Sequence, residues 1–207
     1  EDEKINFTIA PPALLNQLAK SEEMWNQFDF SALRSIGSGS APLAAWMIDV
    51  FDNKYNKRVI NFYGSNEGIS LVSNYKIAPD SETRASMFPR LGAGIADWDL
   101  KSDRYIQTKV IDLVSREEIT IPGHVGELVV KGATIFDGYW DTDNSEVFTP
   151  DGYFLTGDLV EICGNPPNYL RIAGRSKDII NRGGMKISPA EIDVLLEGLP
   201  SALESAV

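Results

Sequence analysis

Residues 33–68 read LRSIGSGSAPLAAWMIDVFDNKYNKRVINFYGSNEG and contain two short apolar runs with a helical pattern between them. The runs at 33–36 and 59–63 are typical of buried strands, and each is followed by a loop rich in Gly and Ser. The pattern over residues 43–55 predicts a helix with its apolar side chains on one face. This strand–helix–strand order predicts a parallel sheet with covering helices, an α/β fold.

The remaining sequence extends this prediction at both ends. Residues 5–10 form a β-rich run, and Pro11-Pro12 begins a helical pattern, because the first turn of a helix tolerates proline. From about residue 91 short strands with frequent glycines predict a small, mostly antiparallel β subdomain. A capping-box pattern at Ser188-Pro189-Ala190-Glu191 predicts a helix near the end.

Three segments are therefore expected: part of an α/β domain over 1–90, a β-rich subdomain over 91–175, and a hinge with the start of an α+β C-terminal domain over 176–207. The loops after the strands at 33–36 and 59–63 lie at their carboxyl ends, where ligands bind in such sheets.

Composition narrows the function classes. The chain has 207 residues, of which 43% are hydrophobic and 24% are charged, as in an ordinary globular protein. Nineteen basic and thirty acidic residues give a net charge of -11, which argues against nucleic acid or an anionic membrane as a partner. A local group of backbone N–H donors with a few basic side chains can still bind phosphate.

The rare residues exclude several kinds of site. The single cysteine, Cys163, excludes an internal disulfide framework and fits a reducing compartment, so a cytoplasmic location is expected. The single histidine, His124, excludes a multi-histidine metal site. No apolar run reaches the length of a membrane span, and the acidic start carries no signal peptide and no initiator Met, which suggests a cut from a longer protein.

Four short segments carry residues suited to ligand chemistry, although each also has an ordinary structural interpretation. The small residues of 38–42 allow a planar ligand to approach the backbone, and in 63–68 an aromatic precedes Ser, Asn and Glu, which suit a base, phosphate and Mg²⁺. Asp158, after Thr-Gly and at the end of a strand predicted over 153–156, can accept both hydroxyls of a ribose. Arg175 and Lys177 can bind phosphate or hydroxyls. Turns with solvated polar side chains are the competing interpretation.

The order of these motifs is more specific than any one of them. The series runs Gly-Ser-Ala-Pro-Leu, Asn-Phe-Tyr-Gly-Ser-Asn-Glu-Gly, Gly-Glu-Leu-Val-Val-Lys-Gly with Gly-Tyr-Trp, Thr-Gly-Asp, and Gly-Arg-Ser-Lys-Asp-Ile-Ile with Gly-Gly-Met-Lys-Ile-Ser-Pro-Ala-Glu-Ile. It resembles the adenylate-forming superfamily, which includes acyl- and aryl-CoA synthetases, adenylation domains of peptide synthetases, and luciferases. The resemblance covers about residues 5–195.

The resemblance implies that residues of several of these motifs bind ATP, Mg²⁺ and the nucleotide product. The residues implied to contact the nucleotide are Ser40, Ala41, Pro42, Phe62, Tyr63, Gly64, Asp158, Arg175 and Lys186. Among them, Tyr63 would stack on adenine, and Asp158 with Arg175 would bind the ribose. Glu67 would hold Mg²⁺, and Asn66, where the family usually has Thr, would donate to the α-phosphate.

The resemblance also implies an acid pocket and a thiol path. The acid pocket would be formed by Ser38, Gly39, Phe62, Ser65, Gly68, Gly92 and Gly94. Gly183 and Gly184 would line the path of the coenzyme A thiol, and Lys177 would be the hinge of the C-terminal domain. Some members have Lys where this chain has Asn181.

The implied activity is ATP-dependent activation of a carboxylic acid through an acyl-adenylate, followed by transfer to coenzyme A. The family's phosphate loop is expected before residue 1 and its catalytic lysine after residue 207, so the chain alone is expected to be inactive. The acid class stays open among fatty, alicyclic and aromatic acids. Alternatives are a non-catalytic nucleotide-binding module and a peptide-synthetase adenylation domain, which usually has an Asp where Met24 and Trp25 stand here.

Overall fold

The computed structural model describes residues 3–100, 104–178, 180–182 and 185–187, together with Pro189, Ile192 and Leu196. The chain forms two compact units, Glu1–Pro89 and Arg90–Val207. Within the described part, no helix has the length and apolar content needed to cross a membrane.

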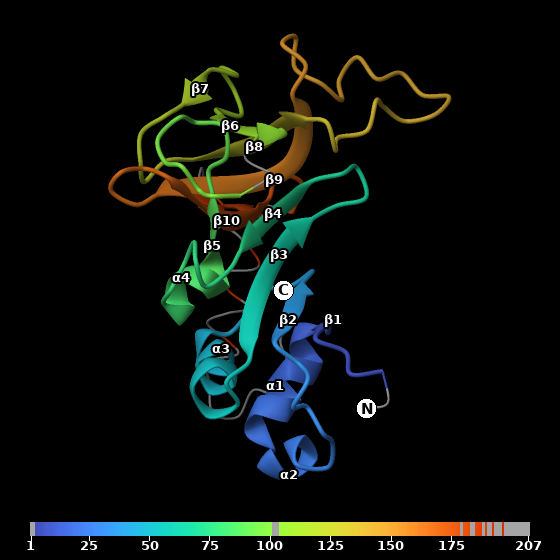
Figure 1. Ribbon diagram of the computed structural model, residues 1–207. Helices are drawn as coiled ribbons and strands as arrows, with labels where there is room; N and C mark the ends of the chain where they lie inside the picture. The colour runs from blue at the N-terminus through green and yellow to red at the C-terminus, as the bar shows by residue number, and fades with distance from the viewer. Residues whose placement is uncertain are drawn as a thin grey trace. The chain divides into compact units, whose positions relative to one another are not determined.

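The first unit is built on one sheet with the strand order β1-β2-β3-β4 (Figure 1). The strands are β1 (Phe7–Ile9), β2 (Ser35–Gly39), β3 (Arg58–Gly64) and β4 (Ser70–Ser73). β1, β2 and β3 are parallel, as the sequence predicts. β4 returns antiparallel to β3, so the sheet is mixed.

Helices α1 (Pro12–Lys20), α2 (Glu22–Trp25), α3 (Ala45–Asp49) and α4 (Ser81–Ser86) accompany this sheet, and β5 (Met87–Pro89) ends the unit. Pro12 stands at the start of α1, where its missing N–H costs nothing. The Ser21 hydroxyl accepts from the Met24 backbone N–H at 3.3 Å and thereby caps α2.

The helix predicted over residues 43–55 is present from Ala45 to Lys54, but its second half is π-helical. α3 is followed by a π-helical turn, Val50–Lys54, which is closed by the Tyr55 backbone N–H donating to the Val50 carbonyl. Phe51 of this turn is fully buried, and the next residue, Asp52, pairs with Arg84 of α4. The sequence pattern identified the buried face but not the wider turn.

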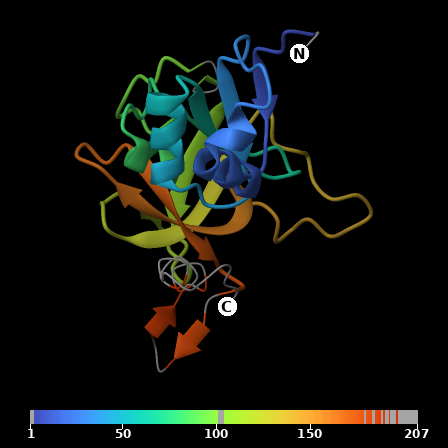
Figure 2. The same cartoon turned by 90° about the horizontal axis from the view of Figure 1, so that it is seen from below.

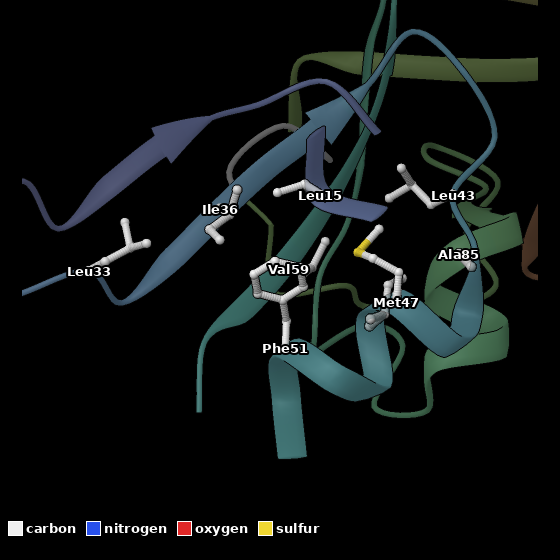
Figure 3. Close-up of a cluster of buried hydrophobic side chains, with 9 residues drawn as sticks. Leu15, Leu33, Ile36, Leu43, Met47, Phe51, Val59 and Ala85 are labelled. Atoms are coloured by element: carbon white, nitrogen blue, oxygen red, sulfur yellow. The ribbon is translucent and has the colours of Figure 1, made fainter. Parts of the chain in front are cut away.

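The core of the first unit lies between the sheet and its helices (Figure 3). Ile36 of β2 and Val59 of β3 are neighbours in register, and both contribute to this cluster. Leu15 of α1 and Met47 of α3 pack with them and are almost fully buried. Burial of each such side chain contributes about 1.5–3 kcal/mol to folding, which holds the sheet and its loops in place.

The second unit contains an antiparallel sheet with the order β10-β9-β8-β6-β7. The strands are β6 (Ile106–Ile111), β7 (Glu118–Ile119), β8 (Val125–Gly132), β9 (Phe154–Cys163) and β10 (Tyr169–Arg175). Ile111, Val129 and Tyr153 form a buried cluster against it. The prediction of a mostly antiparallel β region is confirmed.

A separate antiparallel pair, β11 (Ile180–Arg182) and β12 (Met185–Ile187), follows within this unit. Figure 2 shows the two short strands side by side at the red end of the colour range. The helix predicted from Ser188 lies largely outside the described residues.

Candidate functional site

In the first unit, two predicted ligand loops follow neighbouring parallel strands. β2 ends at Gly39 and β3 at Gly64, and the two strands pair in parallel with Gly39 opposite Phe62. The segments that begin at Ser40 and Ser65 therefore leave the same edge of the sheet, as the sequence predicts. Carboxyl ends of parallel strands are the usual place for ligands in α/β sheets.

Ser38 and Gly39 lie inside β2, and their expected place in a turn is wrong. The Ser38 side chain is fully buried, and its hydroxyl donates to the Ala10 carbonyl oxygen at 2.8 Å. At Gly39 an added Cβ would lie 2.2 Å from the Phe62 backbone oxygen. The close approach of β3 thus keeps these residues in the ladder, and the chain turns one residue later.

The turn itself begins with a conformation that serine rarely adopts. Ser40 has φ +71°, in the left-handed region, and its side chain is exposed. Ala41 and Pro42 follow as exposed residues before the buried Leu43. A side chain in this region costs about 1–2 kcal/mol, and such strain is concentrated at functional positions.

The two aromatic residues at the end of β3 have different surroundings. The ring of Phe62 lies over Gly37, where an added Cβ would be 2.4 Å from Phe62 Cε2. The half-buried ring of Tyr63 lies 5.8 Å from that of Phe88, tilted by 52°. Gly64, the last residue of β3, pairs with Ser70 of β4.

Residues 65–69 form the hairpin loop between β3 and β4. The loop is closed by the Gly68 N–H donating to the Ser65 carbonyl at 3.2 Å and the Ser65 N–H donating to the Ile69 carbonyl at 3.3 Å. Gly68 has φ +99°, which glycine adopts without strain. Ser65 and Asn66 are exposed, and Glu67 is half-buried.

The chemistry of Glu67 suits Mg²⁺ bound together with phosphate. Within the described ranges, no group of three or more His, Cys, Asp or Glu side chains is placed to enclose a metal by itself. Mg²⁺ is commonly held by one or two carboxylates, substrate phosphates and water. A single carboxylate in an otherwise polar loop fits that mode of binding.

In the second unit, Asp158 and Arg175 are direct neighbours. Asp158 lies within β9, so its predicted place at a strand end is wrong, and it stands opposite Arg175, the last residue of β10. Arg175 Nε donates to Asp158 Oδ1 at 2.8 Å. The Asp158 side chain is 11% exposed and that of Arg175 is 62% exposed. Both residues that the resemblance assigns to the ribose are thus brought together.

A bulge in β9 explains how a carboxylate is presented from inside a strand. One residue of β8, Leu128, faces three residues of β9, namely Thr156, Gly157 and Asp158. The Thr156 hydroxyl donates to the Leu128 carbonyl at 2.7 Å and accepts from the Asp158 N–H at 3.0 Å. Bulges of this kind re-aim a side chain and are frequent beside active sites.

The remaining predicted residues of the second unit are placed as follows. Gly92 and Gly94 are exposed, with φ +74° and +68°, in the loop after Leu91. Lys177 is exposed in the turn after β10, and Lys186 lies in β12 opposite Asn181. Gly183 and Gly184 lie outside the described residues.

Sequence reasoning missed one acidic residue next to this site. Glu127 of β8 is buried, and its Oε1 accepts from the Gly157 backbone N–H at 3.1 Å. The signal available was an acidic residue directly before the apolar run Leu128-Val129-Val130. A charge in such a position is expected to have a partner, because an unpaired buried charge is costly.

The rarer residues contribute nothing to these groups. The Cys163 thiol is half-buried, and burial raises its pKa, which disfavours the nucleophilic thiolate. His124 is exposed, and its Nδ1 lies 3.3 Å from the Pro122 carbonyl oxygen. Within the described ranges, neither residue therefore supports a catalytic nucleophile with a base.

Known proteins resemble this chain in sequence and in fold. The sequence pattern of the AMP-binding enzyme family matches residues 1–140. The chain is 31% identical over 208 residues to indoleacetate–CoA ligase of Aromatoleum aromaticum, covering all of this chain and 37% of the relative. It is 27% identical over 200 residues to 4-coumarate–CoA ligase-like 8 of Arabidopsis thaliana, covering 96% of this chain and 34% of the relative.

A solved structure shows the same fold. ATP-bound MatB from Rhodopseudomonas palustris aligns over 99% of this chain and 38% of its own, with a TM-score of 0.76 and 27% identity. The chain therefore spans little more than a third of the length of these relatives. With the family pattern matching two thirds of its residues, this chain belongs to the AMP-binding enzyme family and has part of the adenylate-forming fold.

Proposed function

We propose that this chain is part of a ligase that activates a carboxylic acid with ATP and transfers the acyl group to coenzyme A. The observation that carries the proposal is the pairing of Asp158 with Arg175 on the β9 bulge. A carboxylate can accept from two neighbouring hydroxyls, and an adjacent guanidinium can contribute further donors. This combination suits the ribose of a nucleotide.

The proposed reaction has two steps. A carboxylate oxygen of the acid attacks the α-phosphorus of ATP, and the bond to the bridging oxygen breaks, so pyrophosphate leaves with the electron pair. The thiol of coenzyme A then attacks the acyl carbon of the adenylate, loses its proton, and AMP leaves. Positioning and charge neutralisation account for most catalysis in such transfers.

The described residues would then bind the nucleotide rather than move protons. In the first unit, Tyr63 would stack on adenine, and the exposed turn Ser40–Pro42 would border it through the backbone. Asn66 would donate from its amide to the α-phosphate. Mg²⁺, when bound at Glu67, would neutralise phosphate charge.

In the first unit, the acid pocket is proposed to include Phe62, Ser65 and Gly68. Small or apolar residues predominate in this set, which favours an acid with a largely apolar body. The relative with 31% identity is named for indoleacetate. Aromatic acids are therefore the first substrates to test, with fatty acids next.

The test uses the protein at its full natural length, with ATP, Mg²⁺, coenzyme A and single acids. The panel contains indoleacetate, 4-coumarate, a medium-chain fatty acid and an amino acid, and pyrophosphate, AMP and free thiol are measured. We expect pyrophosphate and AMP in equal amounts, with loss of one thiol per turnover, for at least one non-amino acid. Activity with the amino acid alone, without thiol loss, would favour an adenylation domain, and nucleotide binding with no pyrophosphate from any acid would contradict an enzyme.

A further inference from the structure

Gly157 occupies the centre of the β9 bulge and needs a special backbone conformation. Its φ is +73°, which glycine adopts without a steric penalty. An added Cβ would meet only Ser176 Oγ, at 3.9 Å, so lack of space does not explain the glycine. The backbone direction at this residue is what the site requires, because it sets where the next side chain, Asp158, points.

The backbone carbonyl and the backbone N–H of Gly157 both form hydrogen bonds. Its carbonyl oxygen accepts from the Ser176 N–H at 2.8 Å, and its N–H donates to Glu127 Oε1 at 3.1 Å. In a regular ladder a backbone carbonyl of β8 would take this N–H, but the bulge removes that partner. The Glu127 carboxylate replaces it.

Glu127 is itself fixed in position. Only 6% of the residue is exposed, and its second oxygen, Oε2, accepts from Arg116 Nη1 at 2.7 Å. Arg116 has φ +62° in the turn between β6 and β7, where its N–H donates to the Asp112 carbonyl at 3.1 Å. A buried carboxylate bonded through both oxygens has little freedom to rotate.

We propose that Glu127 is a positioning residue for nucleotide binding. By holding the Gly157 N–H it keeps the bulge in the conformation that presents the Asp158 carboxylate beside Arg175, where it accepts from the ribose hydroxyls of an adenine nucleotide. Glu127 does not touch the nucleotide. The inference rests on the proposed function, because it requires that Asp158 binds the ribose.

The positioning role of Glu127 predicts a change in ligand preference, which a general loss of protein stability does not. If Asp158 accepts from the ribose 2′-hydroxyl, the protein binds AMP more tightly than 2′-deoxy-AMP. Loss of one hydrogen bond to a charged group corresponds to about a tenfold difference in affinity. Displacing the Asp158 carboxylate removes this preference, whereas a smaller folded fraction weakens both ligands equally and leaves their ratio unchanged.

The experiment compares the wild type with Glu127→Ala, Glu127→Gln and Glu161→Ala. Glu161→Ala is the matched control, because Glu161 of β9 is also a strand carboxylate paired with an arginine, Arg171, but stands opposite Val125, outside the bulge. Dissociation constants for AMP and 2′-deoxy-AMP are measured by calorimetry, and exchange of the Gly157 amide by NMR. We expect the wild type and Glu161→Ala to prefer AMP by about tenfold, and Glu127→Ala to lose most of this preference.

Glu127→Gln keeps an oxygen for the Gly157 N–H and loses the charge that faces Arg116, so it tests the inference even if Glu127→Ala does not fold. We expect preference for AMP and protection of the Gly157 amide to fall together in every folded Glu127 variant. A Glu127 variant with a fast-exchanging Gly157 amide and an unchanged preference would overturn the inference and leave the proposed function intact. A wild type that binds both nucleotides equally would overturn the ribose role of Asp158 itself.

Discussion

Arg175 Nε lies 2.8 Å from Asp158 Oδ1, and the two residues stand directly opposite each other in β10 and β9. The Asp158 side chain is largely buried, whereas 62% of the Arg175 side chain is exposed. The Asp158 side chain is therefore enclosed by the protein, while the Arg175 side chain is accessible to a ligand. Such a pair can exchange part of its internal contact for a ligand without unfolding the sheet.

Asp158→Asn is expected to weaken binding of AMP by about tenfold or more, because an amide accepts less strongly from hydroxyls than a carboxylate. Stability should change little. Calorimetric titration with AMP gives the affinity, and urea denaturation gives the stability. An Asp158→Asn variant that is folded and binds AMP as the wild type does would contradict the ribose role.

Arg175→Met separates the two possible functions of the pair. The Arg175 side chain is 62% exposed but that of Asp158 is only 11% exposed, so water replaces only part of the lost contact and a moderate fall of the urea midpoint is expected. Weaker AMP binding is still expected, since the guanidinium donors are lost. A large loss of stability with unchanged affinity would show that Arg175 serves the fold rather than the ligand.

The buried pair Arg84–Asp52 should behave in the opposite way. Arg84 is fully buried, and its Nη1 donates to Asp52 Oδ2 at 2.8 Å, while its other donors contact the Ala78 and Pro79 carbonyls. Asp52→Ala leaves this charge without a counterion, which costs about 3–5 kcal/mol. Urea denaturation of the wild type and the Asp52→Ala variant measures this loss of stability.

Lys54→Ala is the control for this prediction, because Lys54 pairs with Glu22 at 2.8 Å on the exposed surface. Its removal should change the urea midpoint little, because water screens an exposed ion pair. Similar losses in the two variants would show that burial does not govern the strength of these pairs.

Much of the architecture could be predicted from the sequence, because it follows from local patterns. The strand–helix–strand order of residues 33–68 indicated parallel strands with a helix between them, and Pro12 marked the start of α1. The π-helical turn after α3 could not be predicted in this way. Asp52 of this turn pairs with Arg84, a contact between residues distant in the sequence that local patterns do not reveal.

In the candidate site, too, features set by local sequence could be predicted, and features set by contacts between distant residues could not. The small residues after β2 and the polar loop after β3 were identified from composition, and their position at the carboxyl ends of adjacent strands is confirmed. The bulge that places Asp158 within β9 was not predictable, because it arises from the pairing of β8 with β9. Glu127 was missed for that reason, since its partner, Gly157, is thirty positions away in the sequence.

Two glycines should respond differently to alanine. At Gly39 the new Cβ would lie 2.2 Å from a backbone oxygen of β3, so the strands must separate, with an expected cost of about 2–3 kcal/mol. At Gly94 nothing lies within 4 Å, and only the left-handed φ of +68° is unfavourable, at about 1 kcal/mol. Thermal unfolding of both variants tests the order, and a larger loss for Gly94→Ala would contradict it.

The acid titration of Asp151 provides a test in the second unit. Lys109 Nζ donates to Asp151 Oδ2 and the Thr149 hydroxyl to Oδ1, and these bonds lower the pKa of Asp151 from 3.8 to about 2. Because the folded pKa is depressed, the stability from this group is present above pH 3.8 and is lost as the pH falls through about 2. Lys109→Met should raise the pKa of Asp151 towards 3.8, as measured by NMR of its carboxyl carbon.

Lys131→Met is the matched control for this titration, since Lys131 Nζ donates to the backbone oxygen of Asp151 rather than to its carboxylate. Both lysines also lie over the Tyr153 ring, so loss of the cation–π contact is common to the two variants. The pKa of Asp151 should therefore stay near its wild-type value in Lys131→Met. An equal rise in both variants would mean that the local positive charge, and not the hydrogen bond from Lys109, keeps this carboxyl ionised at low pH.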